Sequence, residues 1–253
     1  MCQWLTNIFF HNSGTTEEVV SSSTESNIEN NHENEESMET ENNVYNGIVI
    51  LLDNGHGEST PGKRSYPMDD GYVLREYEFN RDIVKRIAKK LSYMGINFRI
   101  LVPERDIDVS LKERVNRANK YCNEFGKDKC LFISVHANAA QVSDKNPWSS
   151  ARGWSVYTTI GETQSDKYAT IFFEEAEKIL PNYNMTLRKQ MSDGDPDYEE
   201  NFYVIYHTVC PAILTENLFF TNKIDCNFLR SDEGRDVIAQ IHINAIKRIC
   251  GLD

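Results

Sequence analysis

Short apolar segments alternate with longer amphipathic segments from residue 47 onwards. The apolar segments, such as IVILL at 48–52, are continuous runs of aliphatic residues, typical of strands buried on both faces. The amphipathic segments repeat apolar residues at helical spacing, as between Phe79 and Leu91. Strands that alternate with helices form crossover units, which make a parallel sheet covered on both faces. The sequence therefore predicts an α/β fold: a single domain of three layers, with a mainly parallel twisted sheet flanked by helices on both faces.

The boundaries of these segments define the predicted elements. Helix signals include Ser110 with Glu113 three residues later, which is a capping-box pattern, and the helix breakers Gly95 and Pro181. The predicted strands are 48–52, 96–102, 130–139, 153–159, 202–207 and 211–220, and the predicted helices are 75–94, 110–125, 165–180 and 231–250.

Residues 1–46 have a different composition. They contain nine Glu, no Asp, Lys or Arg, and many Ser, Thr and Asn. Such a segment cannot bury enough apolar surface to offset the entropy of ordering, so we expect a disordered acidic N-terminal tail before a folded domain at 47–253. The tail carries most of the formal net charge of −12. The nearly neutral remainder has no basic stripe, so we expect no binding to nucleic acid.

Two further features bear on cellular location. We expect no transmembrane segment, because no apolar run reaches the roughly 18 residues needed to span a bilayer. The N-terminal MCQWLTNIFF has no basic residue before its apolar part, so there is no clear signal peptide. The six cysteines include no CxxC pair, and we expect buried free thiols rather than a zinc ribbon or disulfides.

Polar residues lie where the predicted strands end. The first strand runs into Asp53-Asn54-Gly55-His56-Gly57, the third contains His136, and the sixth contains Glu216. Ligands of open α/β sheets gather at the carboxyl ends of the strands, so these side chains are expected to converge. Glu76 begins the helix that follows the first strand, where the helix N-terminus favours an ionised carboxylate.

This set of residue types suits hydrolytic metal chemistry. Two imidazoles and one carboxylate, with a fourth position open, form a standard catalytic zinc site, and a further carboxylate serves as general base. The glycines beside His56 are expected to leave room for a metal and a bulky substrate. The alternative is that His56 and His136 are hydrogen-bonded turn residues, and the spacing alone does not exclude it.

A series of motifs gives a more specific indication. LLDNGHG, REYEFN, DVSLKERVNRAN, LFISVHANA, ARGWSVYT and NFYVIYHTVCPAILTENLFFTN occur in this order. Together they resemble the successive blocks of the zinc-dependent N-acetylmuramoyl-L-alanine amidases, over about residues 47–250. The resemblance implies Zn²⁺ as cofactor, held by His56, Glu76 and His136, with Glu216 as the catalytic glutamate. It also implies peptidoglycan as substrate, cut between N-acetylmuramic acid and L-alanine.

The chain departs from the family pattern at a few positions. Asn54 stands where the family has proline, and Glu58 where it has glycine; neither supplies a metal ligand. Asn217 and Leu218 replace a Thr-Gly pair after the catalytic glutamate, which leaves the shape of that turn open.

Several residues compete for these roles or are assigned minor ones. Glu78 is the rival of Glu76, but Glu76 has the family's spacing to an asparagine, Asn80. Asn138 is expected either to contact substrate or to stabilise a turn. His207 either contacts substrate or is a hydrogen-bonded residue at the end of a strand.

Three other polar residues and one loop are interpreted structurally. His242 is expected to be structural or exposed in the last helix, and Arg105 and Arg114 are expected to pin a loop. Segment 182–201 is predicted to be a loop that either borders the cleft or is a solvated connection.

Three functions remain to be compared. The first is an active zinc amidase acting on the cell wall, in the periplasm or outside the cell; without a clear signal peptide, it would be made in the cytoplasm and released by another route. The second is a non-catalytic peptidoglycan-binding or regulatory relative, against which Glu216 argues. The third is a zinc peptidase or deacylase with another substrate. The choice between a bacterial autolysin and a phage endolysin is open, as is the oligomeric state.

Overall fold

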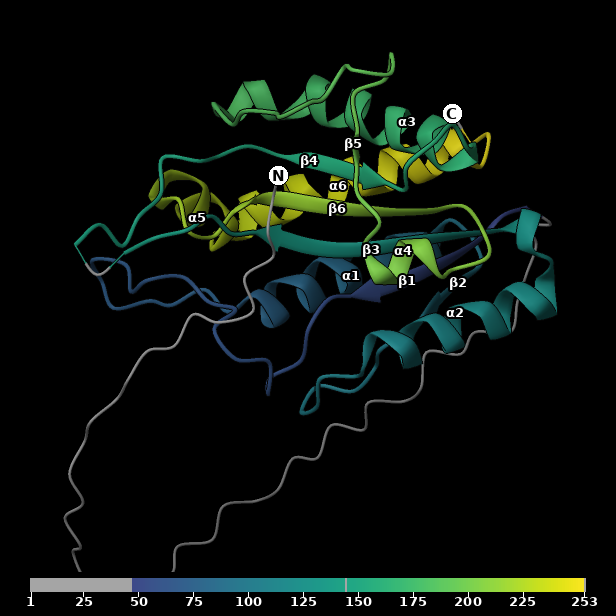
Figure 1. Ribbon diagram of the computed structural model, residues 1–253, viewed down its shortest axis with the longest axis horizontal. Helices are drawn as coiled ribbons and strands as arrows, with labels where there is room; N and C mark the ends of the chain where they lie inside the picture. The colour runs from purple at the N-terminus through teal and green to yellow at the C-terminus, as the bar shows by residue number, and fades with distance from the viewer. Residues whose placement is uncertain (1–46, 144, 253) are drawn as a thin grey trace, which may run out of the picture. The chain divides into compact units, whose positions relative to one another are not determined.

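The computed structural model describes residues 47–143 and 145–252 (Figure 1). Six strands form one sheet in the order β2-β1-β3-β6-β4-β5. The neighbours in β2-β1-β3-β6 are parallel, β4 is antiparallel to β6, and β5 is parallel to β4. The prediction of a mainly parallel sheet is thus confirmed, with a reversed pair of strands at one edge. The strands are β1 (Val49–Asn54), β2 (Phe98–Ile100), β3 (Cys130–Asn138), β4 (Ser155–Thr158), β5 (Tyr198–Glu199) and β6 (Ala212–Phe219).

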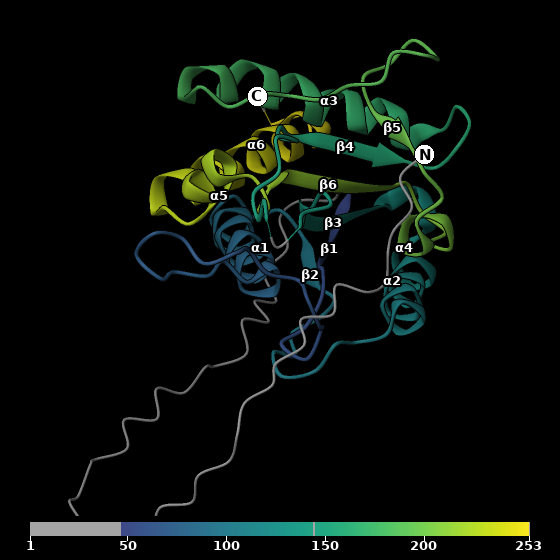
Figure 2. The same ribbon diagram turned by 60° about the vertical axis from the view of Figure 1, so that its left-hand side comes forward.

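Helices cover both faces of this sheet, as the three predicted layers require (Figure 2). One face is covered by α1, α3, α5 and α6, and the other by α2 and α4. The helices are α1 (Glu76–Tyr93), α2 (Leu111–Phe125), α3 (Gln164–Ile179), α4 (Tyr203–Tyr206), α5 (Lys223–Leu229) and α6 (Asp232–Ile249), with short 3₁₀ turns at η1 (Lys127–Lys129) and η2 (Leu180–Tyr183).

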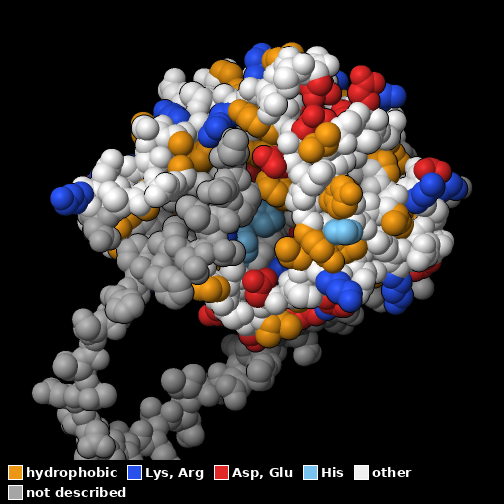
Figure 3. All heavy atoms as spheres, viewed as in Figure 1, with side chains coloured by type: hydrophobic (Ala, Val, Ile, Leu, Met, Phe, Trp, Pro, Cys, Tyr) orange, Lys and Arg blue, Asp and Glu red, His pale blue; other side chains and the backbone are white. Residues whose placement is uncertain are grey.

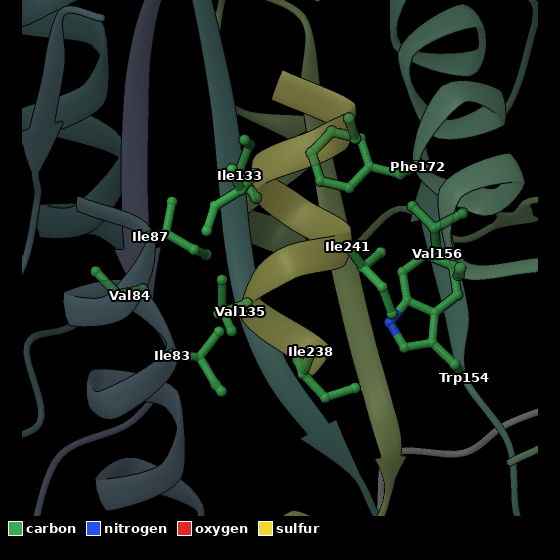
Figure 4. Close-up of a cluster of buried hydrophobic side chains, with 14 of the residues drawn as sticks. Ile83, Val84, Ile87, Ile133, Val135, Trp154, Val156, Phe172, Ile238 and Ile241 are labelled. Atoms are coloured by element: carbon green, nitrogen blue, oxygen red, sulfur yellow. The ribbon is translucent and has the colours of Figure 1, made fainter. Parts of the chain in front are cut away.

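The strands supply alternate residues to two cores. In β3, Ile133 and Val135 face α1 and α6, while Phe132 faces α2. Figure 4 shows the first core, in which side chains of α1, β3, β4, α3 and α6 meet. Because both faces are buried, the strands read in sequence as continuous apolar runs rather than alternating ones.

The four long helices are confirmed, and their ends follow the sequence signals. The Ser110 side chain accepts a hydrogen bond from the Glu113 amide at 3.2 Å. The Glu113 carboxylate instead accepts from Arg117 Nε at 3.0 Å, so only half of the predicted capping box is present. At the end of α3, Pro181 enters the 3₁₀ turn η2 instead of continuing the α-helix.

The prediction of a strand at 202–207 was wrong, since this segment contains the helix α4. Its exposed residues, Tyr203 and Tyr206, are three apart, and its buried residues, Val204 and Ile205, are adjacent. That spacing fits a helical turn rather than a strand, in which successive side chains point to opposite faces. The elements α5 and β5 were not predicted.

The remaining structural predictions are partly tested. Cys122, Cys130, Cys210, Cys226 and Cys250 are free and buried, as expected. No helix among the described residues is long and apolar enough to cross a membrane. The predicted tail at 1–46, which includes Cys2, lies outside the described residues.

Candidate metal centre

Three predicted ligand residues converge at the carboxyl ends of the parallel strands. His56 follows β1, Glu76 is the first residue of α1, and His136 lies near the end of β3. Each offers one ligand atom, and these atoms all lie within 4.8 Å of one another. Glu76 Oε1 is 3.1 Å from His136 Nδ1 and 3.4 Å from His56 Nε2. The two rings are nearly perpendicular, with centroids 4.9 Å apart.

Glu76 is held through both its backbone and its side chain. The Glu76 backbone amide donates to the Lys63 carbonyl at 2.9 Å, and the Ala137 amide donates to Glu76 Oε1 at 3.3 Å. Only 1% of the residue is exposed, and Lys63 Nζ lies 3.9 Å from its Oε2. The start of α1, the end of β3 and the connection from β1 to α1 therefore meet at this one carboxylate.

His56 occupies a left-handed backbone conformation, with φ of 66°. This conformation is unfavourable for a non-glycine residue. Two guanidinium groups hold the His56 carbonyl there: Arg81 Nη1 donates to it at 2.9 Å and Arg114 Nη2 at 3.1 Å. Hydrogen bonds to the His56 backbone thus fix the orientation of its imidazole.

The glycines beside His56 have a different use from the predicted one. A Cβ on Gly55 would lie 2.0 Å from Cε1 of His136, and a Cβ on Gly57 would lie 2.1 Å from the Ile107 carbonyl oxygen. The space at Gly55 is therefore filled by the protein's own histidine ring, and the space at Gly57 by backbone. The expectation that both glycines leave room for metal and substrate was wrong.

Burial and charge set the protonation of the group. Burial lowers the pKa of His56 even though Glu76 opposes this, so its ring is neutral at pH 7, the form that binds metals. Burial alone would raise the pKa of Glu76. The contacts with His56, the charge of Lys63 and the hydrogen bond with His136 outweigh it, and the pKa of Glu76 is well below its ordinary range. The group therefore combines a neutral His56 ring with an ionised Glu76 carboxylate.

Glu216 lies beside this group. It is directly opposite His136 in the pairing of β3 with β6, and neighbouring residues in register on parallel strands point to the same face. Only 1% of it is exposed, and its Oε2 has no hydrogen-bond partner among the described residues. Burial first, and then the charge of Glu76, raise the pKa of Glu216 well above its ordinary range.

The residues with rival or minor predicted roles do not belong to the group of His56, Glu76 and His136. Glu78 is not part of the group, and its carboxylate accepts a hydrogen bond from the Tyr77 hydroxyl at 3.0 Å. The Asn138 side chain accepts from the Ala139 amide at 2.8 Å, a turn-stabilising contact. His207 ends the helix α4 rather than a strand. His242 is fully buried in α6 and is structural.

Arg114 pins a loop, as predicted, and it also holds the end of β1. Its side chain donates to Asp53 Oδ1 at 2.7 Å, to the Asn54 carbonyl at 3.0 Å and to the Val109 carbonyl at 2.8 Å. The residue is only 1% exposed. One buried guanidinium thus joins the end of the first strand to the start of α2.

Sequence reasoning missed three residues of the site. Lys63 is in an irregular connection with no motif around it, so no signal in the sequence marks it. Asn217 donates to the His136 carbonyl at 2.8 Å and accepts from Trp154 Nε1 at 2.7 Å. Arg81 lies five residues after Glu76 on α1, and that spacing was the only available hint.

The histidine group lies in a hollow. Figure 3 shows histidine side chains recessed in a depression of the surface, with acidic and apolar side chains around it. Both His56 and His136 are partly exposed, whereas Glu76 and Glu216 are buried. A ligand can therefore approach the two rings from solvent.

The donor atoms fit a metal ion. His56 Nε2 and Glu76 Oε2 are buried and have no hydrogen-bond partner among the described residues. Unpaired buried polar atoms are costly, and a cation held by these residues would satisfy them. His56, Glu76 and His136 are therefore the residues that could hold a metal.

Comparison with known proteins agrees with this arrangement. The family model for N-acetylmuramoyl-L-alanine amidase matches residues 50–248, a range that contains all five predicted site residues. The chain belongs to the N-acetylmuramoyl-L-alanine amidase family.

Named members of the amidase family are similar to this chain in sequence. The N-acetylmuramoyl-L-alanine amidase LytC of Bacillus subtilis is 32% identical over 197 residues, which are 77% of this chain and 34% of LytC. The endolysin of Bacillus phage SPP1 is 29% identical over 209 residues, 81% of this chain and 66% of the endolysin. The chain thus spans about a third of the first protein and just under two thirds of the second.

Solved amidase structures share the fold. An N-acetylmuramoyl-L-alanine amidase from Clostridium difficile 630 superimposes with a TM-score of 0.63 at 23% identity, over 80% of this chain and 96% of that one. The catalytic domain of CwlV from Bacillus (Paenibacillus) polymyxa gives a TM-score of 0.62 at 21% identity, over 81% and 99% of the two chains. The three-layer architecture is therefore that of amidase catalytic domains.

Leu218 answers the question left open about the turn after Glu216. It adopts the left-handed conformation, with φ of 65°, that a glycine would adopt without strain. The register of β3 with β6 shifts between His136 and Asn138 at this point. Leu218 thus lies within β6 at this irregularity rather than in a turn, and it is a leucine in a backbone conformation suited to glycine.

Proposed function

We propose that this chain is a zinc-dependent N-acetylmuramoyl-L-alanine amidase that hydrolyses the amide between N-acetylmuramic acid and L-alanine in peptidoglycan. The observation that carries the proposal is the convergence of His56, Glu76 and His136 beside the buried carboxylate Glu216. Membership of the amidase family supports the same reaction and substrate. Residues 47–253 are then the catalytic domain, and the protein acts on the cell wall.

In this proposal His56, Glu76 and His136 hold Zn²⁺. Two imidazoles and one carboxylate with an open position are a donor set typical of catalytic zinc. Bound there, Zn²⁺ would supply Lewis acidity to the scissile carbonyl and to the attacking water. Arg81 and Arg114 position His56 through its carbonyl, and Asn217 positions His136 in the same way.

Glu216 is the proposed general base and acid. Its Oε2, which has no protein partner among the described residues, would accept a proton from the attacking water and later return it to the leaving alanine nitrogen. A carboxylate whose pKa is raised by burial holds a proton more readily than an exposed one. The position of Glu216 opposite His136 in the sheet supports a proton transfer at the side of the candidate metal centre.

Asn138 is proposed to contact the substrate. It lies two residues beyond His136 on the same strand and is partly exposed. Its side-chain oxygen already accepts from Ala139, so the amide NH₂ is the group that would donate to a sugar or peptide carbonyl.

The experiment measures bound zinc and released muropeptides in parallel for the wild type and three Glu→Gln variants. Glu216→Gln should keep zinc and lose activity by about 10²-fold or more, as expected for loss of a general base. Glu76→Gln should lose zinc and activity together. Glu78→Gln is the matched control, a change of the same size two residues along the same helix, and should retain both.

The products identify the reaction. Sugar-free peptides that begin with L-alanine establish the bond that is cut. Zinc-loaded wild type that binds peptidoglycan without releasing peptides would replace the enzyme with the binding-module alternative. Release of other products would point to a different hydrolase.

A further inference from the structure

A second group of carboxylates lies away from the candidate metal centre. Asp166 is in the first turn of α3, and Asp195 and Asp197 are in the connection from η2 to β5. One oxygen from each lies within 4.8 Å of the other two. The proposed amidase mechanism uses none of them.

This group is at the opposite end of the sheet. Thr158, the last residue of β4, donates to Asp197 Oδ2 at 2.5 Å. Because β4 runs antiparallel to β6, its end lies where β6 begins, whereas His56 and His136 lie where β1 and β3 end (Figure 1). The two groups are therefore separate sites.

Among the residues that the structure describes, none of the three carboxylates forms an ion pair with Lys, Arg or His. One Asp166 oxygen, Oδ2, accepts a hydrogen bond from the Thr163 amide in the capping box of α3. Asp197 is only 1% exposed, and its Oδ1 has no hydrogen-bond partner in the described part of the chain. Asp195 Oδ1 is also buried without a partner. Like charges at this separation in a poorly hydrated place repel one another and need a neutralising partner.

The surroundings add further oxygen donors. Asp166 and Asp195 line a pocket of about 210 Å³, together with Asp193, Glu162 and Glu199. No nitrogen or sulfur ligand is among these acidic groups, so the site suits a hard cation. Asp193, Asp195 and Asp197 alternate along the chain, the spacing of the first ligands in Ca²⁺-binding loops.

We propose that Asp166, Asp195 and Asp197 bind one Ca²⁺ ion, which fastens the connection before β5 to the start of α3. Ca²⁺ accepts six to eight oxygen ligands in irregular geometry, and the three aspartates with water or the surrounding carboxylates supply them. Mg²⁺ fits less well because it requires near-ideal octahedral geometry.

The consequence of binding is mechanical. The edge strand β5 has only two residues, paired with Tyr157 and Thr158 of β4. The Glu200 amide donates to the Thr158 carbonyl at 3.0 Å, and the Gly161 amide donates to Glu199 Oε1 at 2.6 Å. A cation that joins Asp197 to Asp166 would hold this edge closed without contact with the catalytic residues.

The alternative is a shared proton. Burial and the neighbouring Asp195 raise the pKa of Asp197 to about 7. At neutral pH the repulsion among these carboxylates is therefore reduced either by a proton shared between two of them or by a bound cation. The two cases differ in whether added Ca²⁺ binds.

The test is equilibrium dialysis of the whole 253-residue chain, loaded with zinc, against Ca²⁺, with bound calcium and zinc both measured. Wild type should bind one Ca²⁺ per chain, and Asp195→Asn and Asp197→Asn should bind it at least about tenfold more weakly, because each removes a charged ligand. Asp128→Asn, which changes an exposed aspartate in η1, is the control and should bind Ca²⁺ as wild type does. Zinc content should be the same in all of them.

Unfolding and exchange measurements give a second readout. Ca²⁺ should raise the Tm of wild type and of Asp128→Asn but not of Asp195→Asn. Ca²⁺ should also slow hydrogen exchange at the Gly161 and Glu200 amides of wild type. This measurement needs no variant, so the test remains valid if Asp197→Asn does not fold.

Two results would contradict the proposed calcium site. No saturable binding by folded wild type at about 10 mM Ca²⁺ would refute the site, since even weak calcium modules bind in the millimolar range. Equal binding by all variants would place the ion elsewhere. Neither result depends on whether the protein cleaves peptidoglycan.

Discussion

The ring of His136 occupies the space into which a side chain at Gly55 would extend. A Cβ on Gly55 would lie 2.0 Å from Cε1 and 2.3 Å from Nε2 of that ring. The backbone of Gly55 is itself held on both sides: its amide donates to the Val135 carbonyl at 3.1 Å, and its carbonyl accepts from Asn80 Nδ2 at 3.0 Å. The backbone at the end of β1 therefore lies against the His136 ring and limits the orientations that the ring can adopt.

Gly55→Ala should weaken zinc binding. The added methyl group cannot move away, because the backbone is fixed, so the His136 ring must turn. We expect zinc affinity to fall by about 10- to 100-fold, the usual effect of disturbing the residues that orient a ligand. Competition with a zinc chelator measures this affinity directly.

Gly95→Ala is the comparison for that experiment. A Cβ there meets no atom within 4 Å, but the positive φ of 66° costs stability. It should lower the Tm slightly and leave zinc affinity unchanged. Equal zinc loss in both variants would mean that general destabilisation, rather than the His136 contact, is responsible.

Arg114→Lys should destabilise the protein although it preserves the charge. The guanidinium bonds Asp53 and the carbonyls of Asn54, His56 and Val109, and a lysine ammonium cannot reach all of them. Buried acceptors left unpaired cost about 1–3 kcal/mol each, so we expect a loss of at least about 2 kcal/mol in urea unfolding. Zinc affinity, measured separately by competition with a chelator, should also fall, because the His56 carbonyl loses one of the two guanidinium groups that hold it.

Arg117→Lys is the matched control on the same helix. Arg117 is partly exposed and pairs with Glu104 and Glu113 at the surface. Surface ion pairs contribute about 1 kcal/mol or less, so this variant should be nearly as stable as wild type. Similar losses in both variants would contradict the role assigned to Arg114.

The location of the candidate metal centre could be predicted from sequence because it depends on strand ends. His56, His136 and Glu216 each follow or end an apolar run, and parallel strands bring their carboxyl ends to one edge. Glu76 was placed near them by its position at the start of a helix, but its choice over Glu78 came from the family's spacing to Asn80. Periodicity and topology thus place these side chains, whereas their roles came from the family resemblance.

The supporting residues could not be predicted in this way. Lys63 reaches Glu76 through an irregular connection whose path no local pattern determines. The use of Gly55 depends on the rotamer of a residue 81 positions later, and the helix α4 depends on which face of a short apolar run is buried. Such features arise from tertiary packing, which sequence periodicity does not encode.

Leu218 allows a test of backbone strain beside Glu216. It is fully buried and has φ of 65°. Leu218→Ala and Leu218→Gly both lose the buried side chain, but only glycine relieves the left-handed conformation. We expect Leu218→Gly to be the more stable of the two by about 1 kcal/mol, the reverse of the usual order in a strand. Urea unfolding of the two variants measures the difference, and a more stable alanine variant would show that the conformation is not strained.

His242 should make stability depend on pH, and its environment determines the sign. Its Nδ1 donates to the Ile238 carbonyl at 2.8 Å, so its Nε2 accepts from the Thr215 hydroxyl at 3.0 Å. Burial lowers the pKa of His242 from 6.5 to about 4. The unfolded chain therefore takes up a proton below pH 6.5 that the folded protein does not, and the stability present above that pH is lost as the pH falls towards 4.

The full effect of this one group is on the order of 3 kcal/mol. His242→Gln removes it, so the free energy of unfolding of the variant should fall less than that of wild type between about pH 7.5 and pH 4.5. Both proteins lose zinc and protonate the same carboxylates over this range, so the difference between them isolates His242. Parallel pH profiles for the two proteins would mean that His242 is protonated in the folded state, contrary to its hydrogen bonds.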